Sequence, residues 1–315
     1  TSRASFIIIC FFVLSIYPTF FLSEILLGFG QSLVSGADSA LLYDTMLYYK
    51  KEDAYLKYEG RVTMVGNFSE AFAGIFSGLL AVYSLRFPFY AQSGIAFIGI
   101  PAAMALTEHA AKTRIKNSFA NIVKIIQYSL FTNKELCYNI MFSGVIGAAT
   151  LTMAWFVQPL LIELDTPTSW FGIIWTILNL TVGISALYSD KLDQRLGSLR
   201  MYAFILFFIV SGYIAVAFNI SYVGLICLFF FYIVRGFATP ILKGYINQIT
   251  FSEMRATVLS IRNFVIRLMF AAMAPLVGWL HDLYSLSIPL QATAVIIFVP
   301  GLLFLILQWR YSKKV

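Results

Sequence analysis

The chain has 315 residues, of which 60% are hydrophobic and only 12% are charged, and its formal net charge is +7. Too little polar surface remains to cover a soluble domain of this length, so the composition excludes an ordinary soluble fold. The positive charge does not indicate nucleic-acid binding, because the basic residues are spread over several short stretches and form no single patch.

Ten apolar segments follow one another along the chain. Each is roughly 20 residues long, which suits a hydrocarbon layer about 30 Å thick at a helical rise of about 1.5 Å per residue. The two-residue alternation of polar and apolar side chains that a membrane β-barrel needs is not visible in the sequence, so we expect helices. In chain order, we place the segments at 4–20, 22–46, 62–84, 88–107, 137–161, 168–189, 200–217, 221–242, 257–280 and 287–309.

The basic residues lie in every second gap between these segments, counting both ends of the sequence as gaps. Of the 22 basic residues, Arg86 lies in an opposite gap and Arg235 and Arg267 lie inside segments, while the other 19 follow the pattern. Short cytoplasmic loops retain Lys and Arg, whereas loops on the outer side lose them. We therefore predict a multi-pass protein of the cytoplasmic membrane, with ten spans and both ends of this sequence in the cytoplasm.

One long connection, residues 108–136, separates the first four segments from the last six. Apolar side chains recur in it three or four positions apart, at Ile115, Phe119, Ile122, Ile126 and Leu130. Because basic residues lie among them, the spacing predicts an amphipathic helix on the inner leaflet; a solvated linker helix is the alternative. We divide the chain into an incomplete N-terminal helical bundle (1–107), this linker and a C-terminal six-helix bundle (137–315).

The sequence offers little for an enzyme. It contains no HExxH, GxSxG or GxxxxGK[ST] motif, which would indicate a metal-dependent hydrolase, a serine nucleophile or a phosphate loop. Its three cysteines lie in or beside separate apolar segments, where packing explains them. We therefore predict a protein that is not an enzyme and that has no metal and no cofactor.

Four stretches of the chain share motifs with one family of membrane proteins. They are residues 28–44, residues 59–61 with Glu70, Gly74 and Gly78 after them, residues 189–191 with Gly197 and Arg200, and residues 255–260 leading to 274–278. Together they resemble the major facilitator superfamily of secondary transporters, within a bacterial permease subgroup.

The resemblance implies an all-α fold of two six-helix bundles joined by a long cytoplasmic linker. Since only four segments precede the linker here, the first of them resembles the third helix of the family, and the first two helices look absent. The fold expected for this sequence is therefore a polytopic bundle of ten transmembrane helices, four plus six, instead of twelve.

Five charged residues are predicted at bilayer depth, where a charge is costly and usually faces a cavity or a partner: Glu24, Asp38, Glu70, Arg235 and Arg267. Our hypothesis is that Glu70 or Asp38 carries a proton and that Arg235 or Arg267 responds to its charge or binds an anionic group. The alternative is a static buried ion pair, or an acid that only supports helix packing. Glu24 stands where the resemblance places an Arg in many drug/proton antiporters.

A second set of charges is predicted at the cytoplasmic surface: Asp44, Arg61, Asp190, Lys191, Arg200, Arg255 and Arg262. The resemblance implies that such charges bond across helix ends when the transporter is closed to the cytoplasm and separate when it opens. The alternative is that they are solvated charges that only set the topology.

These observations predict a secondary active transporter that moves a small solute across the cytoplasmic membrane by alternating access. Ion-coupled efflux of a lipophilic or cationic compound is the leading function, with protons as the expected coupling ion. Uptake of a sugar or metabolite is one alternative, and a truncated, non-transporting membrane protein is another. The expected partners are the solute and the lipid bilayer, with no nucleic acid, and the family norm is a monomer.

Overall fold

The computed structural model of the protein describes residues 36–84, 86–105, 119–167 and 170–312. Within these ranges the chain is helical and contains no strand, so the predicted all-α class is confirmed. Segment 4–20, the first part of segment 22–46 with Glu24, and the first part of the linker lie outside the described residues.

The described helices before the linker are α3 (Ala37–Tyr48), the short 3-10 helix η1 (Glu52–Ala54), α4 (Tyr55–Tyr83) and α5 (Phe87–Met104). The linker contains α6 (Phe119–Gln127) followed by one π-helical turn, η2 (Tyr128–Thr132). We refer to α3, α4 and α5 as the N-terminal helices.

The remaining elements follow the linker, and we refer to α7–α13 as the C-terminal helices. They are α7 (Lys134–Glu163), α8 (Phe171–Ala186), α9 (Ser189–Leu196), α10 (Ser198–Phe218), α11 (Tyr222–Gln248), η4 (Ser252–Met254), α12 (Arg255–Leu283) and α13 (Ser287–Ser312). Asn133 caps α7 by accepting a hydrogen bond from the Leu136 amide, and Ser221 caps α11 by accepting one from the Val223 amide.

Most helices extend past the apolar segments predicted from the sequence. The predicted segment 221–242 corresponds to a helix that ends at Gln248, and segment 62–84 to one that begins at Tyr55. Segment 168–189 corresponds to α8, after which the chain turns by 52° into the polar helix α9. Among the described residues, five helices are long and apolar enough to cross a membrane, or six if α8 and α9 form one span. The count of ten therefore stays a prediction.

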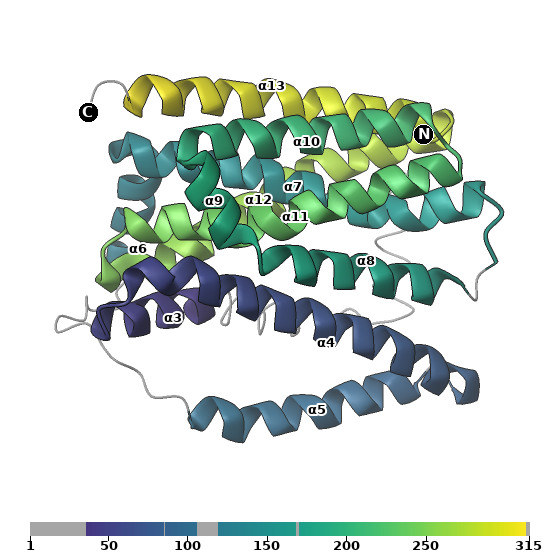
Figure 1. The fold of residues 1–315 in the computed structure, drawn as a ribbon, viewed down its shortest axis with the longest axis horizontal. Coiled ribbons are helices and arrows are strands. Elements are labelled where there is room, and N and C mark those ends of the chain that lie inside the picture. The colour runs from purple at the N-terminus through teal and green to yellow at the C-terminus, as the bar shows by residue number, and fades with distance from the viewer. Residues whose placement is uncertain (1–35, 85, 106–118, 168–169, 313–315) are drawn as a thin grey trace.

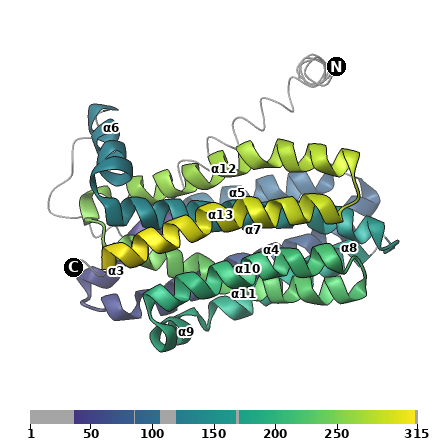
Figure 2. The same cartoon turned by 90° about the horizontal axis from the view of Figure 1, so that it is seen from above.

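The long helices lie side by side along one axis (Figures 1 and 2). A large apolar core fills the space between α7, α8, α10, α11 and α13. One end of the bundle holds the ends of α3 and α11, the starts of α4, α7, α10 and α12, and helix α9; we call it the basic end, after the lysines and arginines around it. We call the opposite end, where α4 ends and α8 begins, the far end.

The N-terminal helices pack on the C-terminal helices mainly through α4 and α8, which lie next to each other in Figure 1. Glycine permits this approach: a Cβ at Gly60 on α4 would lie 2.3 Å from the Ala186 carbonyl oxygen of α8. A Cβ at Gly236 of α11 would lie 2.5 Å from the Val182 carbonyl oxygen, one turn along α8. Small residues at these positions let helix backbones come close in a membrane, which brings both α4 and α11 against α8.

A smaller apolar cluster joins α3 to α7, α11 and α12 at the basic end. It contains Ala40 of α3, Ile246 of α11, and Val258 and Leu259 of α12. The basic end is therefore closed by apolar contacts between N-terminal and C-terminal helices as well as by the polar groups described next.

Candidate functional site

A hydrogen-bonded network around Glu59 joins α4 to α3 and α11 at the basic end. The Glu59 side chain is 0% exposed. Its Oε1 accepts from the Ser39 hydroxyl at 2.8 Å and from the Lys243 ammonium at 2.9 Å, and its Oε2 accepts from the Tyr55 hydroxyl at 3.0 Å. The Asn247 amide in turn donates to the Tyr55 hydroxyl at 2.7 Å. Both oxygens of this buried carboxylate are thus satisfied, by one cation and two hydroxyls.

The helical period places these groups together. Tyr55 and Glu59 are four residues apart on α4, and Lys243 and Asn247 are four apart on α11, so each pair lies on one face of its helix. Lys243 also donates to the Ser39 hydroxyl at 2.9 Å, and its side chain is 17% exposed. The network therefore links three helices through one buried ion pair.

A second network joins α3 to the start of α12. The Arg255 guanidinium donates to the Asp44 carboxylate, and the Ser252 hydroxyl donates to the same carboxylate at 2.9 Å. Arg255 also donates to the Thr250 carbonyl oxygen at 2.8 Å, and it lies over the Tyr43 ring, 4.2 Å from the centroid. Asp44 belongs to an N-terminal helix and Arg255 to a C-terminal one, so this ion pair also connects the two groups.

Both ion pairs found between described residues thus lie at the basic end and connect N-terminal with C-terminal helices. A buried ion pair is stable only while both charges stay together, since removing either one leaves a desolvated charge uncompensated. If the two groups of helices separated, water would have to hydrate all four charged side chains. The two ion pairs can therefore hold the basic end closed.

A third polar group lies deeper in the bundle. Counted at about 1.5 Å per residue, Glu70 lies roughly 22 Å from the start of α4 and Arg235 roughly 20 Å from the end of α11, so their depths agree. Arg235 lies over the Tyr232 ring, 5.3 Å from the centroid, and Tyr232 interacts electrostatically with both Arg235 and Glu70.

Several buried polar atoms at this depth have no hydrogen-bond partner among the described residues. They are Arg235 Nη1, the Tyr232 hydroxyl and, on the adjacent helix α8, Asn179 Oδ1. Buried polar groups are normally paired, so unpaired ones inside a helical bundle indicate a place for water or for a polar group of a ligand.

The structure separates the five charges predicted at bilayer depth. It brings Glu70 and Arg235 to one depth on α4 and α11, although no ion pair forms between them. Asp38 and Arg267 are exposed on α3 and α12 and have no bonded partner among the described residues. Glu24 lies outside the described residues.

The seven charged residues predicted at the cytoplasmic surface also differ in their contacts. Asp44 and Arg255 pair directly. Arg262 is buried on α12, donates to the Ser143 hydroxyl and to the Asn263 side chain, and interacts electrostatically with Glu59 and Asp38. The other four form no ion pair within the described part of the chain: Arg61 and Lys191 lie over the rings of Tyr58 and Tyr188, Asp190 accepts from Gln194 at 2.9 Å, and Arg200 is exposed.

The buried interhelical ion pair Glu59–Lys243 was not predicted from the sequence. Both were assigned to loops because the predicted segments began at 62 and ended at 242. The i, i+4 repeats Tyr55–Glu59 and Lys243–Asn247 were the available signal, since polar pairs with helical spacing favour continuation of the helix past the apolar stretch.

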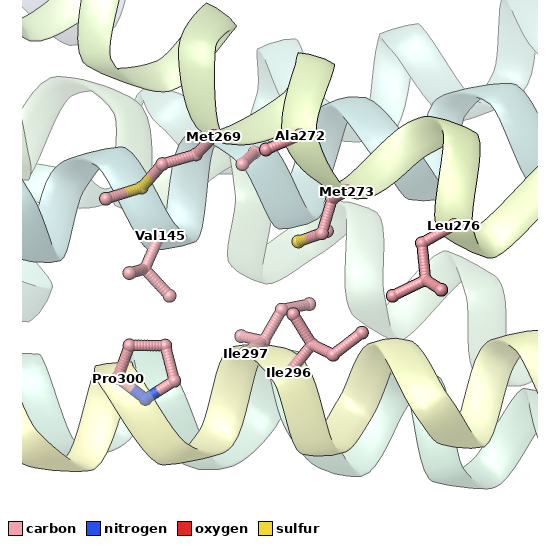
Figure 3. A pocket seen from close by; sticks show the side chains of 9 residues that line it. Val145, Met269, Ala272, Met273, Leu276, Ile296, Ile297 and Pro300 are labelled. Atoms are coloured by element: carbon pink, nitrogen blue, oxygen red, sulfur yellow. The ribbon is translucent and has the colours of Figure 1, made fainter.

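Two cavities lie among the C-terminal helices. The first, shown in Figure 3, has a volume of about 320 Å³ and lies between α7, α12 and α13. Its lining is entirely apolar, with Val145, Met269, Met273, Ile297 and Pro300 around the space. Such a cavity can hold a hydrocarbon chain or ring and offers no hydrogen bond.

The second cavity, of about 500 Å³, lies toward the far end between α7 and α8. The indole side chains of Trp155 and Trp175 line it together with the Gln158 amide. Flat aromatic faces beside an amide suit an organic solute that has both an apolar face and polar edges.

Within the described residues, no three His, Cys, Asp or Glu side chains lie close enough to hold a metal ion. The ion-pair networks, the polar atoms around Arg235 and the two cavities offer charge pairing, hydrogen bonding and apolar contact.

The comparisons with known proteins agree with this fold. A sequence profile described as the Major Facilitator Superfamily matches residues 2–272. The structure is similar to a transporter of that superfamily, FucP, in the outward conformation, with a TM-score of 0.60 and 13% identity over 82% of this chain and 69% of that one. It is also similar to the E. coli fucose:proton symporter FucP, with a TM-score of 0.55 and 14% identity over 88% and 82% of the two chains. No relative was found among curated proteins.

The long apolar helices and the matching family profile define a multi-pass membrane protein of the secondary-transporter class. The chain belongs to the major facilitator superfamily. The predicted family is therefore confirmed, and so is the prediction that the protein is a transporter of small molecules rather than an enzyme.

Proposed function

We propose that this protein moves a small solute across the cytoplasmic membrane by alternating access, coupled to protons, with its basic end facing the cytoplasm. The buried Glu59–Lys243 ion pair between α4 and α11 carries this proposal. We assign the N-terminal and C-terminal helices to the two bundles of the family, 1–107 and 137–315, with 108–136 as the linker. The pair then holds the two bundles together on the cytoplasmic side.

The basic end must open for solute to pass. The Asp44–Arg255 pair and the apolar cluster of α3 with α12 support a closed state at that end. Opening would expose Glu59 and Lys243 to water. Because hydration of the two charges then replaces their attraction to each other, the closed and open states of the basic end can have similar free energies.

We assign proton coupling to Glu70 and the response to Arg235. Tyr232 interacts electrostatically with both, so the two charges lie around one phenol ring. In this proposal Arg235 binds an anionic group more readily in one charge state of Glu70 than in the other. Asp38 is the second candidate for the proton, since Arg262 interacts electrostatically with both Asp38 and Glu59.

Ion-coupled efflux of a lipophilic or cationic compound is the function that we propose first. The apolar cavity between α7, α12 and α13 supports a lipophilic solute, because all its lining residues have apolar side chains, which cannot form a hydrogen bond with a polar group (Figure 3). The exposed acids Asp38 and Glu70 favour a positive charge on that solute.

Uptake of a sugar is the second candidate. The cavity with Trp155, Trp175 and Gln158 supports it, because indole faces stack on the apolar face of a sugar ring and an amide bonds its hydroxyls. The fucose:proton symporter among the similar structures supports the same candidate.

Purified protein in liposomes that contain a pH-sensitive dye would distinguish the two, with the membrane potential clamped at zero. Ethidium added outside should make the lumen alkaline if a cation enters in exchange for protons. L-Fucose should make it acidic if sugar and proton enter together. Acidification by fucose without a response to ethidium would overturn the efflux proposal. No proton movement with either probe, above protein-free liposomes, would contradict proton-coupled transport of both solute classes.

The two arginines predicted at bilayer depth should behave differently in this assay. We expect Arg235→Gln to slow proton-coupled flux at least about tenfold, because Arg235 is partly buried beside Tyr232 and is the proposed partner of an anionic group during transport. A charged hydrogen bond to such a group is worth more than about 1.4 kcal/mol. The exposed Arg267 is the matched control, and Arg267→Gln should leave the flux within about twofold of wild type. Equal losses in the two variants would contradict the assignment.

A further inference from the structure

A third cavity lies at the basic end, beside the two ion-pair networks, with which it shares Tyr43 and Tyr55. It has a volume of about 580 Å³ and is bounded by α3, η1 and α4 on one side and by α9 and α11 on the other. The N-terminal and C-terminal helices therefore each supply one wall. A ligand in this cavity would contact both groups of helices at once.

The cavity is strongly acidic. Four carboxylates line it, and none of its described lining residues is a Lys or an Arg; the nearest cation in contact with the lining is Arg255, which lies over the Tyr43 ring. The carboxylates are those of Glu52, Asp53, Asp190 and Asp193, and Gln194 and Gln248 lie beside them. Asp190 accepts a hydrogen bond from Gln194, and Asp193 accepts one from Tyr245. Glu52 and Asp53 have no hydrogen-bonded or ionic partner in the described part of the chain. Like charges that face one cavity without cations repel one another, so they favour a cation from outside the chain.

Burial adds to this imbalance on the C-terminal wall. It raises the pKa of the Asp193 carboxyl, which the hydrogen bond from Tyr245 opposes and the charge of Asp190 reinforces. The carboxylate form is therefore held in a poorly hydrated place, next to a second negative charge. A cation placed between the walls would relieve both effects.

Tyr43 gives an independent indication of a ligand. Its side chain is only 8% exposed, and it lines the cavity with Tyr55 and Tyr245. Its ring contacts Tyr55 and Arg255, but its hydroxyl forms no hydrogen bond with any described residue and lies in the electrostatic field of Glu52 and Asp53. The residue is mostly buried, yet its hydroxyl has no partner among the described residues and belongs to the lining of the cavity, near two unpaired carboxylates, so it marks a position that a hydrogen-bonding group of a ligand would fill.

The arrangement selects the kind of cation. No three of the described carboxylates lie close enough to share one metal ion, so a compact divalent cation does not match the lining. Charges spread over two walls match an extended molecule with several ammonium groups, and tyrosine faces attract such groups through cation–π contacts. We propose that this cavity binds a linear polyamine from the basic-end side, with ammonium groups on the Glu52/Asp53 wall and on the Asp190/Asp193 wall.

A polyamine that bridges the two walls binds only while the walls are together. It therefore stabilises the arrangement in which the basic end is closed, by the general linkage of binding to conformation. If the proposed transport function is also right, a polyamine on the cytoplasmic side slows the transport cycle. Binding itself does not depend on that function, so the two ideas can fail separately.

Thermal unfolding of the purified full chain with spermidine tests the binding. We expect millimolar spermidine to raise the unfolding temperature more than magnesium chloride or sodium chloride at the same ionic strength. The double substitution Glu52→Gln/Asp53→Asn should weaken spermidine binding, measured by calorimetry, at least about fivefold, as expected for the loss of charge pairs that are partly exposed. Tyr43→Phe, which keeps the ring, should weaken it by a smaller factor.

A matched control at the far end makes the result specific. Glu163→Gln/Asp282→Asn removes two acids from around the ends of α7 and α12, away from the cavity, and should leave spermidine binding unchanged. An equal effect of all three salts at matched ionic strength would show that only screening is involved and would overturn the proposal. Equal weakening in the far-end and cavity variants would overturn it too.

Discussion

Replacing Lys243 with methionine should open the basic end of the bundle. Lys243→Met leaves the Glu59 carboxylate buried with only the hydroxyls of Ser39 and Tyr55 as donors. Removing one partner of a buried ion pair typically costs about 3–5 kcal/mol, which is a factor of more than about a hundred in an equilibrium between closed and open states. The open state avoids most of this cost because water can hydrate Glu59 there.

A thiol at a buried position of the interface would report this opening. Ala40 is 4% exposed and packs against α11 and α12, so Ala40→Cys, with the three native cysteines replaced, should react slowly with a water-soluble maleimide. We expect Lys243→Met to speed this reaction by at least about tenfold. The double variant Glu59→Gln/Lys243→Met should return most of the way to wild type, since no buried charge is left alone.

The control for this experiment is Lys191→Met, which removes an exposed lysine from the same end of the bundle. It should change neither the labelling rate nor the unfolding temperature appreciably. If Lys243→Met labels no faster than Lys191→Met, the Glu59–Lys243 pair does not hold the basic end closed.

The second large effect is expected from Gly60→Ala, which adds a single methyl group between α4 and α8. Gly60→Ala places a Cβ 2.3 Å from the Ala186 carbonyl oxygen, a backbone atom that cannot rotate away, so α4 and α8 must move apart. We expect a loss of about 2–4 kcal/mol in stability, comparable to severe overpacking, together with loss of transport. This loss should appear although alanine is the better helix former by about 1 kcal/mol.

Gly66 on the same helix provides the matched comparison, because a Cβ there would meet no atom of another described element within 4 Å. Gly66→Ala should be neutral or slightly stabilising in a thermal unfolding experiment in detergent. A Gly60→Ala protein as stable and as active as Gly66→Ala would show that the close contact of α4 with α8 is not needed.

Much of the fold could be predicted from the sequence because membrane spans have a simple signature. The apolar segments that became α7, α10, α12 and α13 lie within a few residues of the observed helices. The errors are at the basic end, where α4 and α11 continue past the apolar stretches with residues that are buried against other helices, such as Tyr55 and Asn247. Apolar content defines where the chain can contact lipid, whereas helix ends depend on capping and on contacts between elements, as at Gln248 and Tyr55.

The candidate site was harder to predict for the same reason. Asp44 and Arg255 were both on the predicted list, but nothing in the sequence says that they face each other, since 211 positions separate them. Glu59 and Lys243 were assigned to loops and so were not weighed as a buried pair. Depth along a helix could be counted, which grouped Glu70 with Arg235, but facing direction could not, and Arg267 at a similar depth is exposed.

The central claim is that the N-terminal and C-terminal helices separate at the basic end. Spin labels at Lys57→Cys on α4 and Gln248→Cys on α11, both exposed positions, would measure that separation directly by pulsed electron spin resonance in liposomes. We predict a short distance as the main population in the wild-type chain and a second, longer population that grows in Lys243→Met. A single distance distribution, identical in both proteins, would contradict alternating access through this end.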